Sequence, residues 1–108
     1  MKTRWSLTGL VAIVAMVSAL PAHTAGNVHD LRIAALAATC ANCHGTQGRA
    51  IEGSVVPGLA GQPAGDLADQ MKAFKAGTRP ATVMHQLARG YTDAQIDAIA
   101  AYFAAQKR

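Results

Sequence analysis

The chain has 108 residues, of which 51% are hydrophobic, and ten Lys and Arg residues outnumber six Asp and Glu residues to give a net charge of +4. This length allows one small domain. The basic excess is too small and too scattered to indicate nucleic-acid binding. The only two cysteines, Cys40 and Cys43, lie three positions apart, so any cysteine chemistry is concentrated at one point.

Residues 1–25 have the pattern of a secretory signal peptide. Two basic residues precede a largely apolar stretch, 7–20, and small residues follow it. The apolar stretch is shorter than a membrane span requires. We expect cleavage after Ala22 or Ala25, which predicts export, into the periplasm of a bacterium. If it stays uncleaved, the same segment is the chain's only predicted membrane anchor. Residues 26–108 then form one domain with eight bases and six acids, a charge of about +2.

The rest of the chain shows helical periodicity and no sustained period-two alternation, which predicts an all-α fold. The first helix is expected at 28–40. Four of its residues fall at i, i+3, i+4 and i+7 and form one apolar face, namely Ile33, Leu36, Ala37 and Cys40. We therefore expect this helix to place Cys40 on its buried side.

A glycine-rich loop comes next, with six glycines between positions 45 and 65. No strand pattern precedes it, which argues against a phosphate-binding loop. A loop of this length in a small domain usually carries function, and its glycines predict tight bends around a bound group.

Two further helices are expected beyond the loop. One covers 63–77, with Pro63 at its first position and Gly77 as its terminator. The chain around Pro80 is expected to be irregular, with room for one or two helical turns at 84–90.

The last helix has the clearest signals. It starts at Thr92, and Gln95 three residues later completes a capping box. Its apolar row consists of Ile96, Ile99, Ala100 and Phe103.

The pentapeptide Cys40-Ala41-Asn42-Cys43-His44 allows three chemistries. A thioredoxin-like dithiol requires a strand–helix setting, which the sequence lacks. A zinc site requires four ligands, and only His29 and His85 are available to complete one, without a second paired cluster. Cys-x-x-Cys-His is the recognised signal for covalent haem c attachment. Two thiols one helical turn apart can add to the two vinyl groups of a porphyrin, and His44 then presents its imidazole to the iron.

A sixth iron ligand is expected from a methionine. Met71 lies on an apolar stripe with Leu67 and Phe74, which favours a role in the core. Met84 follows Pro80 in irregular chain and is the preferred ligand, with His85 as the runner-up. His29 is expected to be solvated. A His/Met pair gives a higher potential than two histidines, which suits an electron acceptor. No catalytic residue is expected; the rival class is a haem enzyme or gas sensor with an open iron position, which a Met84 ligand argues against.

The segments "TCANCHG", "VPGLAG" and "RPATVMHQLARGYTDAQIDAIAAYFA" resemble the small monohaem class I c-type cytochromes over nearly all of 26–108. The resemblance implies N- and C-terminal helices packed together around a covalent haem. It also implies that Cys40 and Cys43 bind the haem, with His44 and Met84 as axial ligands. The family's proline matches Pro57, whose carbonyl would accept the ring proton of the histidine.

A narrower likeness covers residues 53–104, which resemble the cytochrome subunit of flavocytochrome c sulfide dehydrogenase. In that complex a haem domain accepts electrons from an FAD subunit that oxidises sulfide. One Cys-x-x-Cys-His motif implies the single-haem form. The alternative is a freestanding soluble cytochrome that shuttles electrons between respiratory or photosynthetic partners.

Overall fold

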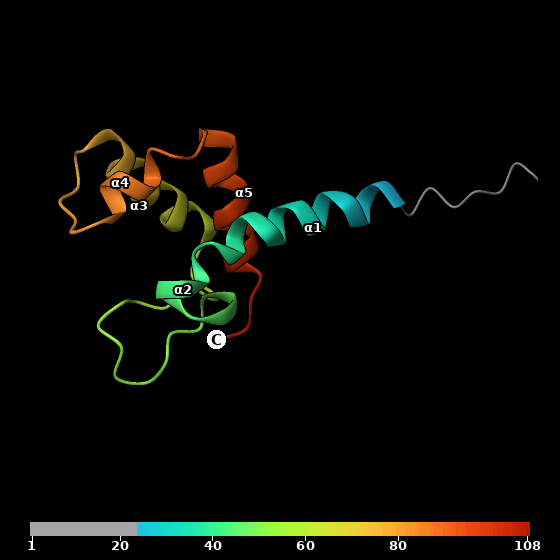
Figure 1. The fold of residues 1–108 in the computed structure, drawn as a ribbon, viewed down its shortest axis with the longest axis horizontal. Coiled ribbons are helices and arrows are strands. Elements are labelled where there is room, and N and C mark those ends of the chain that lie inside the picture. Colours follow the sequence, from blue (N-terminus) through green and yellow to red (C-terminus); the bar gives the residue numbers. More distant parts are fainter. Residues whose placement is uncertain (1–23) are drawn as a thin grey trace, which may run out of the picture.

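The structure, a computed structural model, describes residues 24–108 and is built from helices (Figure 1). Within that range there is no strand, so the expected all-α class is confirmed. The elements in chain order are α1 (Thr24–Ala38), α2 (Ala41–His44), the 3₁₀ helix η3 (Thr46–Gly48), α3 (Ala64–Ala76), α4 (Met84–Ala88) and α5 (Asp93–Ala104). The signal segment expected at 1–25 lies almost entirely outside the described residues.

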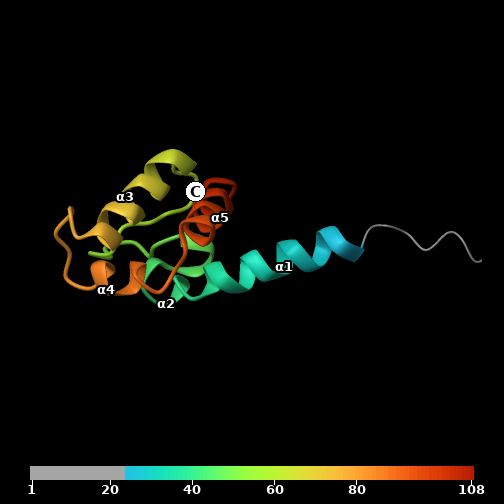
Figure 2. The same cartoon turned by 90° about the horizontal axis from the view of Figure 1, so that it is seen from above.

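The first and last helices pack together, as the resemblance implies. Ala37 of α1 is buried with Ile99 and Phe103 of α5, and the half-buried Cys40 lies against this cluster. The N-terminal half of α1 instead projects away from the other helices in both views (Figures 1 and 2). The packing of α1 on α5 therefore fixes the end of α1 that leads into the cysteine motif.

α1 is already helical at Thr24, the first described residue and four positions before the expected start, and it ends at Ala38 rather than at Cys40. The early end has a local cause. The Thr39 hydroxyl donates to the carbonyl of Leu36 at 2.7 Å, and the Cys40 N–H donates to the carbonyl of Ala37 at 3.0 Å. These bonds to residues three positions back close the helix, because they replace the bonds that would continue it.

α3 packs on α5 through a second buried cluster of Ala68, Ile96 and Ala100. Pro63 is the N-cap of α3 rather than its first residue, one position from the expected start. Gly77 ends the helix in the left-handed conformation with φ of 77°, as expected.

The start of α5 confirms the predicted capping box. The N–H of Gln95 donates to the Thr92 hydroxyl at 3.2 Å, and the N–H of Thr92 donates to the Gln95 side chain at 2.9 Å. All four residues of the expected apolar row are buried: Ile96, Ile99, Ala100 and Phe103.

α4 is a short helix that packs on α3. Met84 is its first residue, so the expectation of irregular chain at Met84 is wrong, whereas the expected helical turns at 84–90 are present. Ala88, one turn after Met84, is completely buried and anchors α4 to the body of the fold. Among residues 24–108, no helix is both long enough and apolar enough to cross a membrane.

Candidate functional site

The two cysteines lie on either side of the start of α2. Cys40 is the N-cap of α2, and Cys43 and His44 lie inside the helix. The N–H groups of Cys43 and His44 both donate to the Cys40 carbonyl, at 3.3 Å and 3.0 Å, so the segment is one tight helical turn. Neither thiol is in a disulfide. Cys43 is exposed and Cys40 half-buried, and burial raises the pKa of the Cys40 thiol, an effect that its contact with the Thr39 hydroxyl opposes.

His44 is buried, with 8% of its surface exposed. Its Nδ1 lies 2.7 Å from the carbonyl oxygen of Pro57, thirteen residues further along the chain. Because a carbonyl oxygen can only accept, Nδ1 carries the hydrogen, and the lone pair of the neutral ring is on Nε2. This contact confirms the role expected for Pro57 from the resemblance. It fixes the tautomer and the orientation in which an imidazole binds a metal.

The glycine-rich loop brings Pro57 to His44 by folding back on η3. The carbonyl of Gly48 accepts hydrogen bonds from the N–H groups of Leu59, at 2.7 Å, and Ala60, at 3.1 Å. Gly48 is buried and has φ of 76°, and a Cβ at this position would lie 2.7 Å from Cδ1 of Phe103. Only glycine fits here, because the position combines a left-handed backbone with close contact to an aromatic ring.

Met71 and Met84 have different surroundings in the fold. Met71 is half-buried and packs on the cluster of Ala68, Ile96 and Ala100, as expected for a core residue. Met84 is also half-buried but starts a helix that has no side-chain cap. Its neighbours Val83 and Leu87 expose 49% and 48% of their surface.

The other two histidines of the described chain do not join the cysteines in a metal site. His29 lies on α1, where its side chain is 74% exposed and pairs with Asp30 at 3.6 Å, as expected for a solvated residue. His85 is half-buried, and its Nδ1 has no hydrogen-bond partner within residues 24–108. In the same range no three His, Cys, Asp or Glu side chains come together in a group that could bind a metal ion, so no zinc ligand set is formed there.

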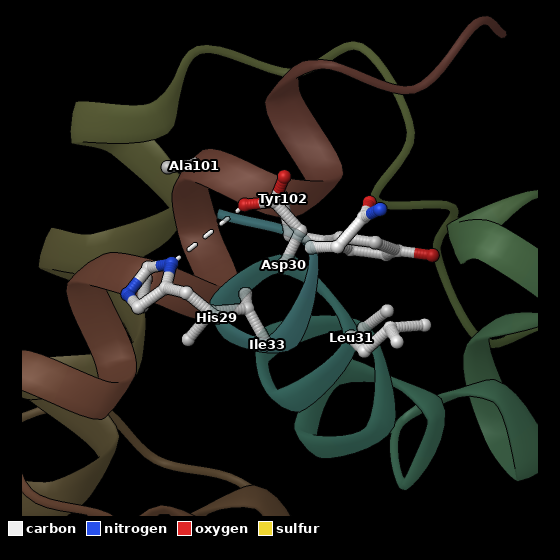
Figure 3. Close-up of a pocket in the computed structure, with 9 residues that line it drawn as sticks. His29, Asp30, Leu31, Ile33, Ala101 and Tyr102 are labelled. Carbon is white, nitrogen blue, oxygen red and sulfur yellow. Dashed lines mark ion pairs between the residues drawn. The ribbon is translucent and has the colours of Figure 1, made fainter. Parts of the chain in front are cut away.

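One cavity adjoins the cysteine motif, and another lies apart from it. One of about 400 Å³ opens beside Cys43, between α2 and the loop residues Arg49, Ile51 and Ser54. A larger one of about 500 Å³ lies between the N-terminal half of α1 and α5, with Leu31, Ile33 and the ring of Tyr102 in its lining and the His29–Asp30 pair beside it (Figure 3). The second contains none of the expected haem-binding residues.

A contact that the sequence did not suggest joins Thr39 to Tyr91. The two hydroxyl oxygens are 2.8 Å apart although the residues are 52 positions apart in the chain. Thr39 directly precedes Cys40, and Tyr91 follows α4. Neither residue belongs to a recognisable motif, and the only signal for Tyr91 was its position beside the capping box of α5.

The donor set of this region fits a haem c. It offers two unpaired sulfur atoms on one helical turn, and a buried imidazole whose Nδ1 is bonded and whose Nε2 has a free lone pair. The bent, glycine-rich loop begins directly after His44 in the chain. These are the groups that two thioether bonds and one axial iron ligand require.

Comparison with known proteins agrees with this chemistry. Residues 32–107 match the model of the cytochrome c family. The chain is 41% identical over 64 residues to the thiosulfate dehydrogenase electron acceptor of Stutzerimonas stutzeri, covering 56% of this chain and 29% of the relative. It is 40% identical over 60 residues to the cytochrome subunit of sulfide dehydrogenase of Chlorobaculum tepidum, covering 56% of this chain and 53% of the relative.

A third relative is cytochrome c-554(548) of Halomonas halodenitrificans, 39% identical over 67 residues that cover 59% of this chain and 80% of the relative. The chain thus spans about a third to a half of the first two relatives and most of the third. The match to the family model extends over more than half of the chain and includes both cysteines and His44. The chain belongs to the cytochrome c family and carries one covalently bound haem c.

Proposed function

We propose that Cys40 and Cys43 attach the haem, and that His44 and Met84 are the axial ligands of its iron. The bound iron supplies a one-electron couple. His44 contributes Nε2, and Pro57 keeps the ring in place through Nδ1 at 2.7 Å. Met84 contributes a thioether sulfur, a soft ligand that raises the reduction potential relative to a second histidine. With both positions of the iron taken by side chains, the chain suits electron transfer rather than substrate or gas binding.

We propose that the protein works after export, with residues 1–25 acting as its signal peptide and 26–108 as its single domain. The Cys-x-x-Cys-His motif supports this, because c-type haem is attached to its cysteines on the exported side of the membrane. In a bacterium the location is the periplasm.

For the partner, we propose an FAD subunit that oxidises sulfide and passes electrons singly to this haem. The observation that carries this proposal is the 40% identity to the cytochrome subunit of sulfide dehydrogenase, which spans 53% of that relative. The surface supports a lasting complex. Two β-branched residues of the loop near Cys43 are strongly exposed, Ile51 at 79% and Val55 at 99%. Apolar side chains in such positions are typical of a surface that a partner covers.

Charge supports the same interpretation. The eight bases and six acids of 26–108 nearly cancel. Two of the lysines are also paired on the surface, Lys72 with Asp97 at 2.6 Å and Lys75 with Asp93 at 2.7 Å. Long-range electrostatic steering is therefore weak, and a cytochrome with weak steering gains more from a stable apolar contact than from repeated diffusional encounters.

The second candidate is a freestanding carrier. It is favoured by cytochrome c-554(548), of which the matched segment covers 80%. Purification of the native protein at moderate salt separates the two. The subunit proposal predicts that haem absorbance elutes together with flavin absorbance and that sulfide reduces the haem. Elution at the size of this chain alone, without flavin and without reduction by sulfide, would leave the freestanding carrier.

A matched pair of variants locates the contact. Val55→Ser should weaken association with the flavoprotein, whereas Val28→Ser, which changes a 53% exposed valine on the projecting half of α1, should not. Equal affinity of both variants and the wild type would remove the loop near Cys43 from the interface.

A further inference from the structure

The hydroxyl groups of Thr39 and Tyr91 form a hydrogen bond whose direction the structure determines. Thr39 Oγ1 donates its single hydrogen to the carbonyl of Leu36 at 2.7 Å. It must therefore accept from Tyr91, whose oxygen is 2.8 Å away. The Tyr91 hydroxyl therefore donates to Thr39, and the Thr39 hydroxyl in turn donates to the Leu36 carbonyl at the end of α1.

Both ends of this bond are attached to backbone that carries a proposed haem-binding residue. On one side, the N–H of Thr39 bonds to Leu36, and the next turn contains Cys40. On the other side, the N–H groups of Gly90 and Tyr91 donate to the carbonyls of Leu87 and Ala88, at 3.0 Å and 3.2 Å. Tyr91 is therefore continuous, through hydrogen-bonded turns, with the helix that starts at Met84.

No other hydrogen bond within residues 24–108 directly joins segment 39–44 to segment 84–91. The ring of Tyr91 packs against both buried clusters, the one around Ala37 and the one around Ala68. Its position is thus fixed by packing, and the hydroxyl adds a directional link between the two segments. Such a link limits how far the start of α4 can move relative to the cysteine motif.

We propose that Tyr91 is a positioning residue for the axial methionine: through Thr39, its hydroxyl fixes the Met84 segment against the haem-attachment segment and so favours the iron–sulfur bond. This inference rests on the proposed function, in which Met84 binds the iron. It predicts that loss of the hydroxyl increases the fraction of protein in which Met84 is detached, while the haem stays covalently bound through the cysteines.

The test measures how strongly added imidazole binds the oxidised holoprotein, since imidazole can bind the iron only where Met84 has left. Tyr91→Phe removes the hydroxyl and keeps the ring, and it should raise the apparent affinity about 2- to 10-fold, as expected for loss of one hydrogen bond. Tyr102→Phe is the matched control, because Tyr102 is also half-buried and its hydroxyl makes no hydrogen bond within residues 24–108. It should bind imidazole as the wild type does.

A double-mutant cycle tests whether Tyr91 acts on Met84 through its hydrogen bond with Thr39. Thr39→Val should raise the affinity like Tyr91→Phe, the double variant should add no further increase, and Thr39→Ser, which keeps a hydroxyl, should behave like the wild type. If Tyr91→Phe binds imidazole no more tightly than Tyr102→Phe, or if the effects of Tyr91→Phe and Thr39→Val simply add, the inference is wrong.

A separate measurement distinguishes this failure from failure of the proposed function. The sulfur-to-iron charge-transfer absorption of the oxidised protein should be present in the wild type and absent in Met84→Ala. Should it persist in Met84→Ala, the ligand assignment and the inference fall together. Should it depend on Met84 while Tyr91→Phe leaves imidazole affinity unchanged, only the role of Tyr91 falls.

Discussion

The two sides of the proposed iron site are built differently. His44 is buried on the helical turn that carries the two cysteines, directly after Cys43, and its ring is oriented by the backbone carbonyl of Pro57. Met84 is half-buried at the start of the five-residue α4, which has no side-chain cap and packs on α3, and the nearby side chains of Val83 and Leu87 are exposed. The histidine side is fixed by local backbone, whereas the methionine side depends on contacts between distant segments.

This difference suggests that one side of the site holds the haem and the other sets its potential. In the proposed site, covalent attachment and the Pro57 contact would keep the haem and the His44 ligand in place whatever the state of the iron. The methionine side of the proposed site would determine the potential, because a thioether sulfur is a weaker ligand whose position neighbours such as Tyr91 could tune. The predictions below perturb one side at a time.

The largest effect is expected on the methionine side. Met84→Ala should lower the reduction potential by on the order of 0.2 V and abolish the sulfur-to-iron charge-transfer absorption, because the iron loses its thioether ligand. Redox titration of the purified holoprotein, followed by its absorption spectrum, measures both.

Met71→Ala is the matched control for this experiment. Met71 packs on Ala68, Ile96 and Ala100, so its truncation should keep the absorption and the potential and lower the free energy of unfolding by about 2 kcal/mol, at the low end for a half-buried side chain. Loss of the absorption in His85→Ala, with Met84→Ala unaffected, would transfer the ligand role to His85.

An intermediate effect is expected from the loop that holds Pro57 against His44. Gly48→Ala forces a Cβ to within 2.7 Å of the Phe103 ring at a φ of 76°, and should lower the free energy of unfolding by on the order of 3 kcal/mol. Gly53 has almost the same φ, 77°, with nothing within 4 Å of its Cβ position. Gly53→Ala should therefore lose only on the order of 1 kcal/mol, for backbone strain alone.

Denaturant unfolding of the two glycine variants gives this difference directly. Equal losses would mean that the contact between Gly48 and Phe103 does not constrain the loop.

The smallest effect is expected from the ion pairs between α3 and α5. The hydrogen bond from Lys75 lowers the pKa of Asp93 below its ordinary value of 3.8, so its stabilisation is present above that value and is lost as the pH falls through it. The hydrogen bond to Asp97 raises the pKa of Lys72 above 10.5, so its stabilisation is present below that value and is lost as the pH rises. Both pairs are at the surface, so the contributions are small.

Melting temperatures measured from pH 3 to 9 test the dependence expected for Asp93. Asp93→Asn should melt slightly below the wild type at neutral pH and converge with it as the pH falls below 4, while Glu52→Gln, which changes an exposed loop acid, should not show this convergence. A constant gap between Asp93→Asn and the wild type down to pH 3 would contradict the assignment.

Sequence reasoning succeeded where the signal is local. The capping box of Thr92 and Gln95 and the terminator Gly77 each depend on a few neighbouring residues, and the structure has both. The apolar row of α5 is likewise set by helical spacing, and all of it is buried. The contact between His44 and Pro57 spans thirteen residues and was expected only through the family resemblance.

Errors arose where a side chain competes with the backbone or where distant residues meet. The Thr39 hydroxyl takes the Leu36 carbonyl and ends α1 before Cys40, which apolar periodicity cannot show. Helical turns at 84–90 were expected, but the expectation of irregular chain at Met84 itself was wrong, because Met84 is the first residue of α4, which packs on α3. The bond between Tyr91 and Thr39 joins residues 52 positions apart and has no motif at either end.

Mass spectrometry under denaturing conditions tests the central claim most directly. Unfolding removes every noncovalent contact, so only thioether bonds from Cys40 and Cys43 can keep the haem on the chain. The account predicts a polypeptide that retains the mass of one haem and has no thiol available for alkylation. A haem-free polypeptide with two free thiols would contradict it.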